Sequence, residues 1–377
     1  MRILVLNWRD IRNPDMGGAE VHLHEIMKRV ASAGHDVLQV SHSVKGLPDS
    51  ETIDGIRIVR RGGRLTFNLG LRRFCERLDG SFDLIIEDLC KLPFYSPRWG
   101  MAPVMVVVPH LFGTTAYREV SLPLALYVNA LEKLIPSVYA GSPFVAISQS
   151  TKADLVRRGI QQDSISVVEC GIDTAHYHPV AGVTAAPGTM LYVGRLKRYK
   201  GIQYILKALS ALARRGHDYR LVLQGTGDYE GPLRRMAAGL EGLEGRVDFQ
   251  GRVSEVRKLE WLTRAWVAVF PSEKEGWGLT VIEANACGTS VVASNSDGLR
   301  DSVRHGETGY LVPQAAAWAG LSESGRCEEL ERTLETVLSD PEHHSRMKPA
   351  CLQWARRFSW DETGRRMLAL IEKAAAG

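Results

Sequence analysis

The sequence predicts an α/β protein built from two doubly wound domains, each a parallel sheet covered by helices. Short apolar runs rich in valine and isoleucine alternate with amphipathic stretches through the first half of the chain, and the pattern starts again in the second half. The runs are continuously apolar, which is typical of parallel strands buried on both faces. A chain of 377 residues is long enough for two such domains, each with its own core.

The apolar runs give the expected strands in chain order. In the first domain they are residues 3–6, 37–40, 84–86, 104–108, 144–147 and 166–168, and in the second they are residues 190–193, 221–223, 247–249, 267–270 and 290–293. Between the first two strands, apolar residues recur at steps of four, three and four and mark the buried stripe of a helix: Ala19, Leu23, Ile26 and Val30. Residues 202–213 and 279–286 are expected to be helices of the second domain.

A segment rich in proline, glycine and alanine, residues 179–188, separates the two sets of strands and suits a linker. We therefore expect the first domain at residues 1–173 and the second at residues 174–356. Ligands of open parallel sheets bind beyond the carboxyl ends of the strands, so the loops that follow strands are where chemistry is expected. Two such domains facing each other would bring these edges to a common cleft.

The composition excludes several classes of protein. With 47 basic and 43 acidic side chains, the net charge of +4 is too small to indicate a nucleic-acid binder. No run of eighteen apolar residues predicts a membrane span, and the first apolar run is too short for a signal peptide, so a cytoplasmic protein is expected. The cysteines lie far apart without a C-x-x-C pair, which favours reduced, mostly buried thiols: Cys75, Cys90, Cys170, Cys287, Cys327 and Cys351.

The first segment with chemical character is Met16-Gly17-Gly18-Ala19-Glu20, between the first strand and the first helix. Paired glycines let the backbone come close to a ligand, and the helix N-terminus offers N–H groups to an anion. The segment does not match G-x-G-x-x-G, so a dinucleotide fold is not specifically indicated. The alternative is a tight strand-to-helix turn with no ligand.

The second segment follows the first strand of the second domain and runs from Tyr192 to Gly201. It places four cations on one loop at the carboxyl end of a strand, where they can converge on phosphate oxygens: Arg195, Lys197, Arg198 and Lys200. The alternative is a solvated basic loop, which is what most runs of charge are. The position ahead of a helix favours an anion site.

The third segment, residues 275–288, is the most specific. Two glycines precede an apolar helix, and two carboxylates, Glu275 and Glu283, stand eight positions apart, one in the loop and one in the first turns of the helix. Carboxylates accept hydrogen bonds from neighbouring hydroxyls, and a helix N-terminus attracts phosphate. A sugar at one end and a ribose at the other would use both. The alternative is a surface glutamate and a glutamate paired elsewhere on its helix.

In this order and separation, the three segments resemble glycosyltransferase family 4, whose enzymes have the GT-B fold. Glu275 and Glu283 match the family's two carboxylates with seven residues between them, Gly17-Gly18 match its glycine-pair loop, and residues 194–201 match its G-R-x-x-x-x-K-G phosphate loop. The resemblance implies two Rossmann-like domains facing across a cleft, with a last helix, residues 357–377, that crosses back to the first domain. Residues 297–301 depart from the family's G-G-x-P-E stretch.

The resemblance also implies a role for individual residues. Four would be catalytic: Glu275, His110, Arg195 and Lys200. Arg195 and Lys200 would hold the donor diphosphate, Glu275 would bind hydroxyls of the transferred sugar, and Glu283 would bind the ribose. His110 would face the sugar and Val253 the base. Backbone N–H groups of the two N-terminal turns would assist at the donor: Gly17, Gly18, Trp277, Gly278, Leu279 and Thr280.

The implied activity is that of a retaining hexosyltransferase using a UDP- or GDP-linked sugar and a hydroxyl acceptor, in glycan, glycolipid or polysaccharide synthesis. No cofactor besides the donor is expected. Metal-dependent transferases usually show a D-x-D motif, and no two aspartates here are two positions apart. No metal ligands are therefore predicted, and fixed cations and helix ends are expected to stabilise the departing diphosphate.

Four alternatives compete with a transferase acting on a glycan or lipid. In the first alternative, the enzyme is a transferase whose acceptor is a small soluble metabolite. In the second, it is a nucleotide-sugar epimerase, which is disfavoured because such epimerases lack the loop-and-helix pair of glutamates found here. A non-enzymatic sugar-binding protein of the periplasmic type would need an export signal. A dehydrogenase is disfavoured because Gly225-Thr226-Gly227-Asp228 lacks the third glycine of the dinucleotide motif.

A last feature of the sequence concerns the acceptor. Arginines gather in the first domain and are opposed within that span only by Glu76: Arg57, Arg60, Arg61, Arg64, Arg72, Arg73 and Arg77. Residues 122–138 form a helix that is strongly apolar for a surface element. A basic and apolar first domain would dock on the inner face of an anionic membrane and reach a lipid-linked acceptor. The alternative is a solvated arginine face and an ordinary core helix.

Overall fold

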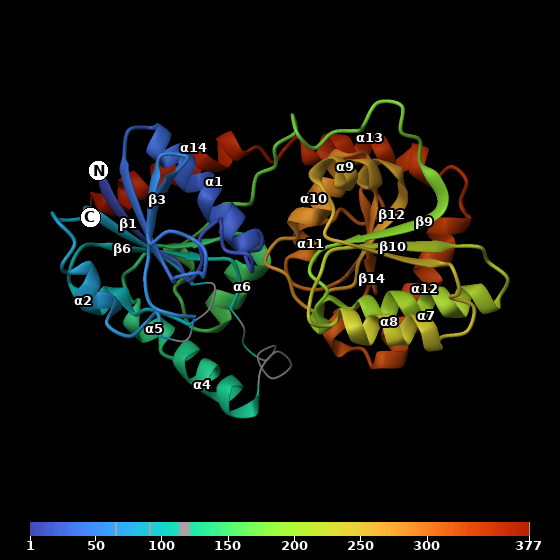
Figure 1. The fold of residues 1–377 in the computed structure, drawn as a ribbon, viewed down its shortest axis with the longest axis horizontal. Coiled ribbons are helices and arrows are strands. Elements are labelled where there is room, and N and C mark those ends of the chain that lie inside the picture. The colour runs from blue at the N-terminus through green and yellow to red at the C-terminus, as the bar shows by residue number, and fades with distance from the viewer. Residues whose placement is uncertain (65, 90–91, 112, 114–120, 377) are drawn as a thin grey trace. The chain divides into compact units, whose positions relative to one another are not determined.

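The computed structural model describes residues 1–64, 66–89, 92–111, 113 and 121–376 (Figure 1). The chain divides into two compact units. Unit 1 comprises Met1–Gly171 together with the residues from Ser359 onward, and unit 2 is the continuous segment Ile172–Phe358. The chain therefore leaves unit 1 once, completes unit 2, and returns to unit 1.

Unit 1 is built on an eight-stranded sheet of order β3-β4-β2-β1-β5-β6-β7-β8, parallel except for β3, which pairs antiparallel with β4. The strands are β1 (Arg2–Leu6), β2 (Asp36–Ser41), β3 (Ser50–Ile53), β4 (Ile56–Arg60), β5 (Leu84–Asp88), β6 (Val104–Val108), β7 (Phe144–Ala146) and β8 (Ile165–Val167). The central strands are buried along almost their whole length, as their continuous apolar sequences predict. The edge hairpin β3–β4 was not predicted, because neither strand forms a continuous apolar run: β3 has no buried residue, and in β4 buried residues alternate with more accessible ones.

The helices of unit 1 are α1 (Gly18–Ser32), α2 (Leu71–Cys75), α4 (Leu122–Glu132), α5 (Ile135–Val138), α6 (Gln149–Arg157) and α14 (Trp360–Ala375). Helix α1 buries the predicted stripe, with Leu23, Ile26 and Val30 almost fully inaccessible. The last helix, α14, lies against α1 although more than 300 residues separate them in sequence (Figure 1). Its Met367 and Ile371 complete the same apolar cluster.

Unit 2 holds a six-stranded parallel sheet of order β11-β10-β9-β12-β13-β14. The strands are β9 (Ala186–Val193), β10 (Arg220–Gln224), β11 (Val247–Gly251), β12 (Ala265–Phe270), β13 (Val291–Ser294) and β14 (Gly309–Val312). The helices are α7 (Ile202–Arg214), α8 (Glu230–Gly239), α9 (Glu255–Arg264), α10 (Leu279–Ala286), α11 (Leu299–Ser302), α12 (Glu323–Ser339) and α13 (His343–Ala355). The five predicted strands are confirmed, and β14 is an addition. The predicted fold class, two doubly wound α/β sheets, is therefore confirmed.

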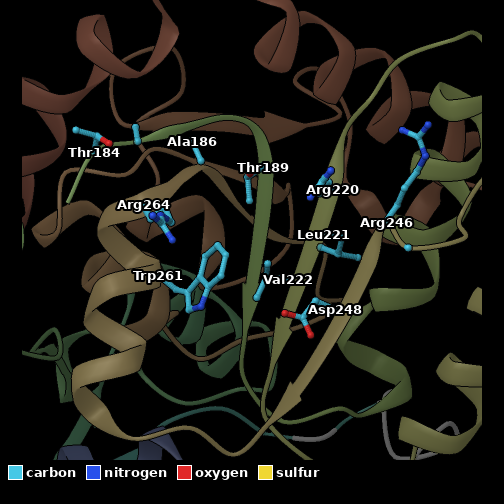
Figure 2. A pocket seen from close by; sticks show the side chains of 12 residues that line it. Thr184, Ala186, Thr189, Arg220, Leu221, Val222, Arg246, Asp248, Trp261 and Arg264 are labelled. Atoms are coloured by element: carbon cyan, nitrogen blue, oxygen red, sulfur yellow. The ribbon is translucent and has the colours of Figure 1, made fainter.

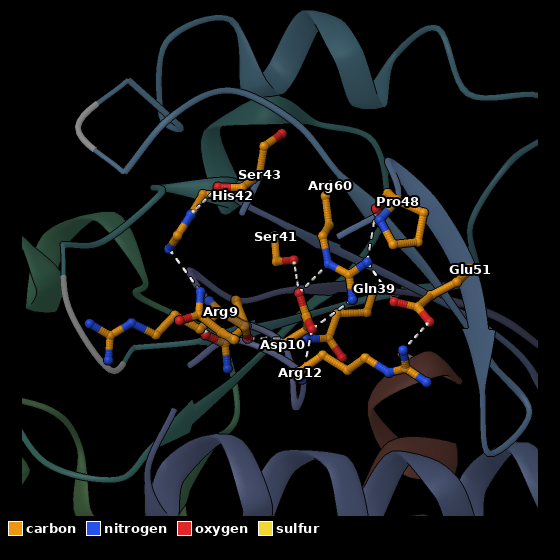
Figure 3. Close-up of polar contacts among 12 residues, drawn as sticks. Arg9, Asp10, Arg12, Gln39, Ser41, His42, Ser43, Pro48, Glu51 and Arg60 are labelled. Carbon is orange, nitrogen blue, oxygen red and sulfur yellow. Dashed lines mark hydrogen bonds and ion pairs between the residues drawn. The ribbon is translucent and has the colours of Figure 1, made fainter. Parts of the chain in front are cut away.

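The arginine cluster expected on the surface of unit 1 is partly wrong, because Arg60 points inward (Figure 3). Its guanidinium donates to both oxygens of Asp10, at 2.8 Å each, and lies 2.6 Å from Glu51. Ser41 donates a further hydrogen bond to Asp10. Burial alone would raise the pKa of Asp10, but the hydrogen bonds from Arg60, the Arg12 backbone and Ser41 lower it. Arg60 therefore neutralises a buried carboxylate at the carboxyl edge of the sheet.

The apolar helix expected at residues 122–138 is divided into α4 and α5. Helix α4 exposes large apolar side chains, with Leu122 63% and Leu126 53% accessible, alongside Leu124 and Tyr127, while Ala125 and Val128 are buried. The core-helix alternative is thus wrong for most of α4. No helix among the described residues combines the length and the apolar character that crossing a bilayer requires.

The cysteines agree with the expectation of free thiols as far as they are described. Of the five described cysteines, all are free, four are buried, and Cys327 is half-buried. Burial raises the pKa of the Cys287 and Cys351 thiols to about 12, which makes them unreactive near neutral pH. Cys90 lies outside the described residues.

Candidate active site

The loops at the carboxyl ends of the strands of unit 2 gather most of the predicted site residues at one edge of the sheet. Arg195 and Lys200 follow β9, Val253 follows β11, and Glu275 follows β12. Because all strands of this sheet are parallel, these loops leave from the same edge. Glu283 lies on the helix α10 that the Glu275 loop opens.

Glycines let the loop after β10 pack backbone against backbone with the loop after β9. A Cβ on Gly225 would lie 1.9 Å from the carbonyl oxygen of Gly194, and a Cβ on Gly227 would lie 2.2 Å from that of Leu196. The N–H groups of Gly194 and Leu196 donate to the carbonyls of Gln224 and Thr226, each at 2.9 Å. The Gly225-Thr226-Gly227 stretch therefore supports the loop after β9, and Gly225 and Gly227 are needed because this packing leaves no room for a side chain.

Lys200 and Glu275 form an ion pair between the loops after β9 and β12, with Lys200 Nζ 2.5 Å from Glu275 Oε1. The side chains are only 16% and 19% exposed. The loops come together because Gly201, at φ +74°, lies against the carbonyl of Pro271, where a Cβ would be 2.1 Å from the oxygen. Burial by itself would lower the pKa of Lys200, but the charge and hydrogen bond of Glu275 together with the nearby Tyr199 outweigh burial, and the pKa is raised. Lys200 is thus a fixed cation beside a carboxylate.

Arg195 lies on the same loop as Lys200, near two tyrosines. Its guanidinium donates to the Tyr199 hydroxyl at 3.2 Å, and the Tyr192 hydroxyl donates to the Arg195 carbonyl at 2.9 Å. Of the other cations predicted on this loop, Lys197 pairs with Asp228 at 2.5 Å, and Arg198 is exposed. The four cations therefore do not converge as one group.

Glu283 forms a second ion pair, which was not predicted. Lys258 of α9 places its Nζ 2.9 Å from Glu283 Oε2 and donates a hydrogen bond to the Tyr177 hydroxyl at 2.8 Å. The side chains of Lys258 and Glu283 are 15% and 14% exposed. Burial would lower the pKa of Lys258, but Glu283 and Tyr177 outweigh it and raise the pKa. The short motif around Glu283 contains no signal for a partner on another helix.

The start of α10 and the loop after β13 fix the position of Glu275. Gly278, at φ +96°, precedes the first turn of α10, and buried Trp277 packs edge-to-face on Phe358. Leu279 and Thr280 begin the helix and are half-buried. Gly298 approaches so closely that a Cβ would lie 2.5 Å from the Glu275 carbonyl. The stretch that departs from the family pattern therefore keeps a glycine that packs on the glutamate loop.

Gly17, Gly18 and His110 belong to unit 1, on the loops after β1 and β6. Gly17 precedes α1, and its N–H donates to the Glu20 carboxylate at 2.7 Å. One of the N–H groups expected to face a ligand is therefore already bonded within the turn. His110 is half-buried two residues beyond β6. Among the described residues, no group of three histidines, cysteines or carboxylates is arranged to hold a metal ion.

Two sequence families match consecutive parts of the chain. "Glycosyltransferase Family 4" matches residues 16–176, and "Glycosyl transferases group 1" matches residues 177–354. The boundary between them lies close to the point where the chain passes from unit 1 to unit 2.

Curated relatives are similar over part or nearly all of the chain. The chain is 33% identical over 234 residues to D-inositol 3-phosphate glycosyltransferase of Pseudarthrobacter chlorophenolicus, a match that covers 58% of this chain and 53% of that protein. The chain thus spans about half the length of that relative. It is 28% identical to glycogen synthase of Mycobacterium tuberculosis, over 96% of this chain and 92% of that protein.

Solved structures share the fold over the whole length. Sucrose-phosphate synthase from Thermosynechococcus elongatus superposes with a TM-score of 0.80 at 21% identity, covering 100% of this chain and 99% of that one. Anabaena HepE in complex with UDP-glucose superposes with a TM-score of 0.75 at 18% identity, covering 99% of this chain and 100% of that one. The fold is therefore that of GT-B glycosyltransferases. Matched from residue 16 to residue 354, the chain belongs to the group 1 glycosyltransferases, with a family 4 N-terminal half.

Proposed function

We propose that the protein transfers a hexose, with retention of configuration, from a UDP- or GDP-linked sugar to a hydroxyl acceptor. The observation that carries the proposal is the largely buried Lys200–Glu275 pair, with Arg195 on the same loop, at the carboxyl edge of the sheet of unit 2. Membership of the group 1 glycosyltransferases supports it. So does the UDP-glucose held by the structurally similar HepE.

The mechanism we propose uses fixed positive charge to stabilise the leaving group. As the bond to the sugar breaks, negative charge develops on the departing diphosphate, which Lys200 and Arg195 would bind. The backbone N–H groups of residues 277–280 would add the N-terminal dipole of α10. Fixed cations would supply the charge that a divalent ion supplies in other transferases, so we propose metal-independent turnover.

The carboxylates would bind the two sugars of the donor. Glu275 would accept hydrogen bonds from hydroxyls of the transferred hexose, and its ion pair with Lys200 orients it for this. Glu283, oriented by Lys258, would accept the ribose hydroxyls, and Val253 would contact the base. His110, of unit 1, would face the transferred sugar. Attack of the acceptor from the face that the diphosphate leaves would let that diphosphate take the acceptor's proton.

The test is turnover with UDP-, GDP- and ADP-sugars in variants of the ion pair. Lys200→Met and Glu275→Gln should each lower kcat by about 10²–10³-fold, because each removes a group that acts on developing charge or on the sugar. Lys207→Met is the matched control, since it removes a lysine of the same unit that pairs with Glu323. Near-normal turnover in both Lys200→Met and Glu275→Gln would reject the site.

Binding and chelation experiments test the donor and the metal. The nucleotide of the true donor should stabilise the protein by about 2.7 kcal/mol at a hundredfold excess over its dissociation constant. Turnover should persist in excess EDTA. A strict requirement for Mg²⁺ or Mn²⁺ would contradict the metal-independent mechanism but leave the donor assignment intact.

We also propose that unit 1 docks on the inner face of an anionic membrane to reach a lipid-linked acceptor. Helix α4 exposes Leu122, Leu124, Leu126 and Tyr127, and Arg64, Arg72, Arg73 and Arg77 are exposed in the same unit. Apolar side chains would enter the headgroup region and arginines would attract anionic lipids. A small soluble acceptor is the competing proposal.

Sedimentation with phosphatidylglycerol vesicles tests the docking. Leu122→Ser with Leu126→Ser should weaken binding, whereas Val256→Ser, which removes a similarly exposed apolar side chain of unit 2, should not. Binding should also fall as salt rises, because the arginine contribution is screened. No binding, or equal binding by all three proteins, would leave the soluble acceptor as the better proposal.

A further inference from the structure

A cavity of about 540 Å³ lies at the amino-terminal ends of β9, β10 and β11 (Figure 2). Thr189 of β9 and Arg220 of β10 line it, together with Trp261 and Arg264 from the end of α9. The candidate active-site loops leave from the opposite, carboxyl ends of the same strands. At about 3.3 Å per residue, the four residues from Thr189 to Val193 separate the two ends by about 13 Å. The cavity is therefore distinct from the candidate active site of unit 2.

The cavity is electropositive. Three arginines and one carboxylate, Asp248, line it. Arg246 is paired with Asp218 at 2.9 Å. Among the described residues, no carboxylate forms an ion pair with Arg220 or Arg264. Two guanidinium groups without a counter-charge therefore border one hollow.

Trp261 positions one of these cations. The guanidinium carbon of Arg264 lies 5.8 Å from the centroid of the Trp261 ring. A cation–π contact attracts the guanidinium but leaves its charge uncompensated and its N–H groups available for hydrogen bonds. Figure 2 shows Arg264 and Trp261 side by side on α9, facing the strands that carry Thr189 and Val222. The arginine is thus oriented by an aromatic ring rather than by an acid.

The chemistry of the lining selects a class of ligand. Guanidinium groups are forked donors that fit phosphate oxygens. The volume of the cavity falls within the range of sites for small metabolites, so it can take more than a single inorganic anion. Asp248 and the hydroxyls of Thr184 and Thr189 can exchange hydrogen bonds with hydroxyl groups, whereas Asp248 would repel a second anionic group.

We propose that this cavity binds a sugar phosphate at a site separate from the donor site. Arg220 and Arg264 bind the phosphate, and Asp248 and the threonines bind the sugar hydroxyls. Exposed arginines are often merely solvated. These two differ because they border the same cavity and one of them is held against a tryptophan. The proposal does not depend on the identity of the donor or of the acceptor.

The experiment measures thermal unfolding and binding with four probes: glucose 6-phosphate, glucose, inorganic phosphate and UDP. The test variant is Arg220→Gln with Arg264→Gln. The control is Arg214→Gln, which removes an exposed arginine at the end of α7, outside the lining. Because Arg220 and Arg264 are exposed and lack ion pairs with the described carboxylates, the test variant should melt within about 2 °C of the wild type.

Glucose 6-phosphate should stabilise the wild type and the control but not the test variant, with a dissociation constant at least about tenfold weaker in the test variant. Glucose and inorganic phosphate should bind more weakly than glucose 6-phosphate, because each offers only part of the ligand. Equal affinity for inorganic phosphate, or unchanged affinity in the test variant, would overturn the proposal. So would a loss of UDP binding in that variant, since the cavity would then belong to the donor site. A wild type that fails to bind UDP but binds glucose 6-phosphate would contradict a UDP-linked donor and leave this site standing.

Discussion

Gly201→Ala tests whether the contact between the loops after β9 and β12 determines activity. The added methyl group would lie 2.1 Å from the Pro271 carbonyl oxygen and 2.9 Å from its carbon, at φ +74°. Two separate costs follow. A left-handed alanine costs about 1–2 kcal/mol. The clash adds about 1–3 kcal/mol, because one of the two loops must shift by about 1 Å or more to restore an ordinary contact.

Gly216→Ala is the matched control, since Gly216 has φ +89° and a Cβ added there would meet no atom of the described residues within 4 Å. It should therefore show the backbone cost alone. We expect unit 2 to lose about 1–2 kcal/mol in Gly216→Ala and about 2–5 kcal/mol in Gly201→Ala. At roughly 3 °C per kcal/mol for a domain of this size, these losses lower the melting temperature by about 3–6 °C and about 6–15 °C.

Turnover separates the two variants further. Gly201 directly follows Lys200, and Pro271 opens the loop that ends at Glu275, so a shift of the contact moves both members of the ion pair. A displacement of about 1 Å can lower turnover on the order of 10²-fold. Gly216→Ala should stay near the wild type, with both variants assayed below their melting temperatures. If Gly201→Ala melts at the same temperature as Gly216→Ala and keeps turnover within about threefold of it, the contact between the two loops does not determine activity.

Three further predictions concern ionisable side chains in the interior. Lys258→Met should lower the free energy of unfolding by about 2–4 kcal/mol in urea titrations, because it leaves the largely buried Glu283 without its cation. Adding Glu283→Gln to this variant should recover part of the loss. An unchanged free energy of unfolding in Lys258→Met would mean that the pair is not formed. Burial lowers the pKa of His22 to about 4 in the folded protein, so as the pH falls below about 6.5 the unfolded state binds a proton that the folded state does not. The contribution of His22 to the free energy of unfolding is therefore complete above about pH 6.5 and should decline by about 3 kcal/mol down to pH 4. His22→Leu should flatten this decline in urea titrations across pH, and parallel curves for the two proteins would contradict the assignment. Arg60→Met should destabilise unit 1 by about 3–5 kcal/mol in chemical denaturation, whereas Arg57→Met, at an exposed pair, should change it by less than about 1 kcal/mol; equal effects would show that burial of the pair does not matter.

The sequence predicts what local pattern determines. Continuous apolar runs predict the buried strands of both sheets, and the spacing of Glu275 and Glu283 predicts one carboxylate in a loop and one on the following helix. The loop that carries Lys200 was also expected at the end of a strand. That Lys200 pairs with Glu275 requires contact between segments 75 residues apart, and no local pattern encodes it.

The features that were not predicted also depend on contacts between residues that are far apart in sequence. Arg60 was expected at the surface because its neighbours in sequence are basic, yet Asp10, 50 residues earlier, draws it into the interior. Lys258 sits on an amphipathic helix among other charges, and only the fold brings it to Glu283. Residues 314–326 carry no clear pattern, and Arg326 proves to be buried against Glu273, 3.2 Å away. The roles of the site residues in catalysis stay predictions.

The route of the chain between the units has a consequence for biosynthesis. Met367 and Ile371 of α14 belong to the same apolar cluster as Ile3 and Val5 of β1, so the earlier-translated part of unit 1 lacks one of its helices until α14 has emerged from the ribosome. Unit 2 depends on no such late arrival, because it is one uninterrupted segment. The second globule should therefore finish folding before the first, and during translation the nascent N-terminal half exposes the apolar stripe that α14 will cover, a surface suited to a chaperone.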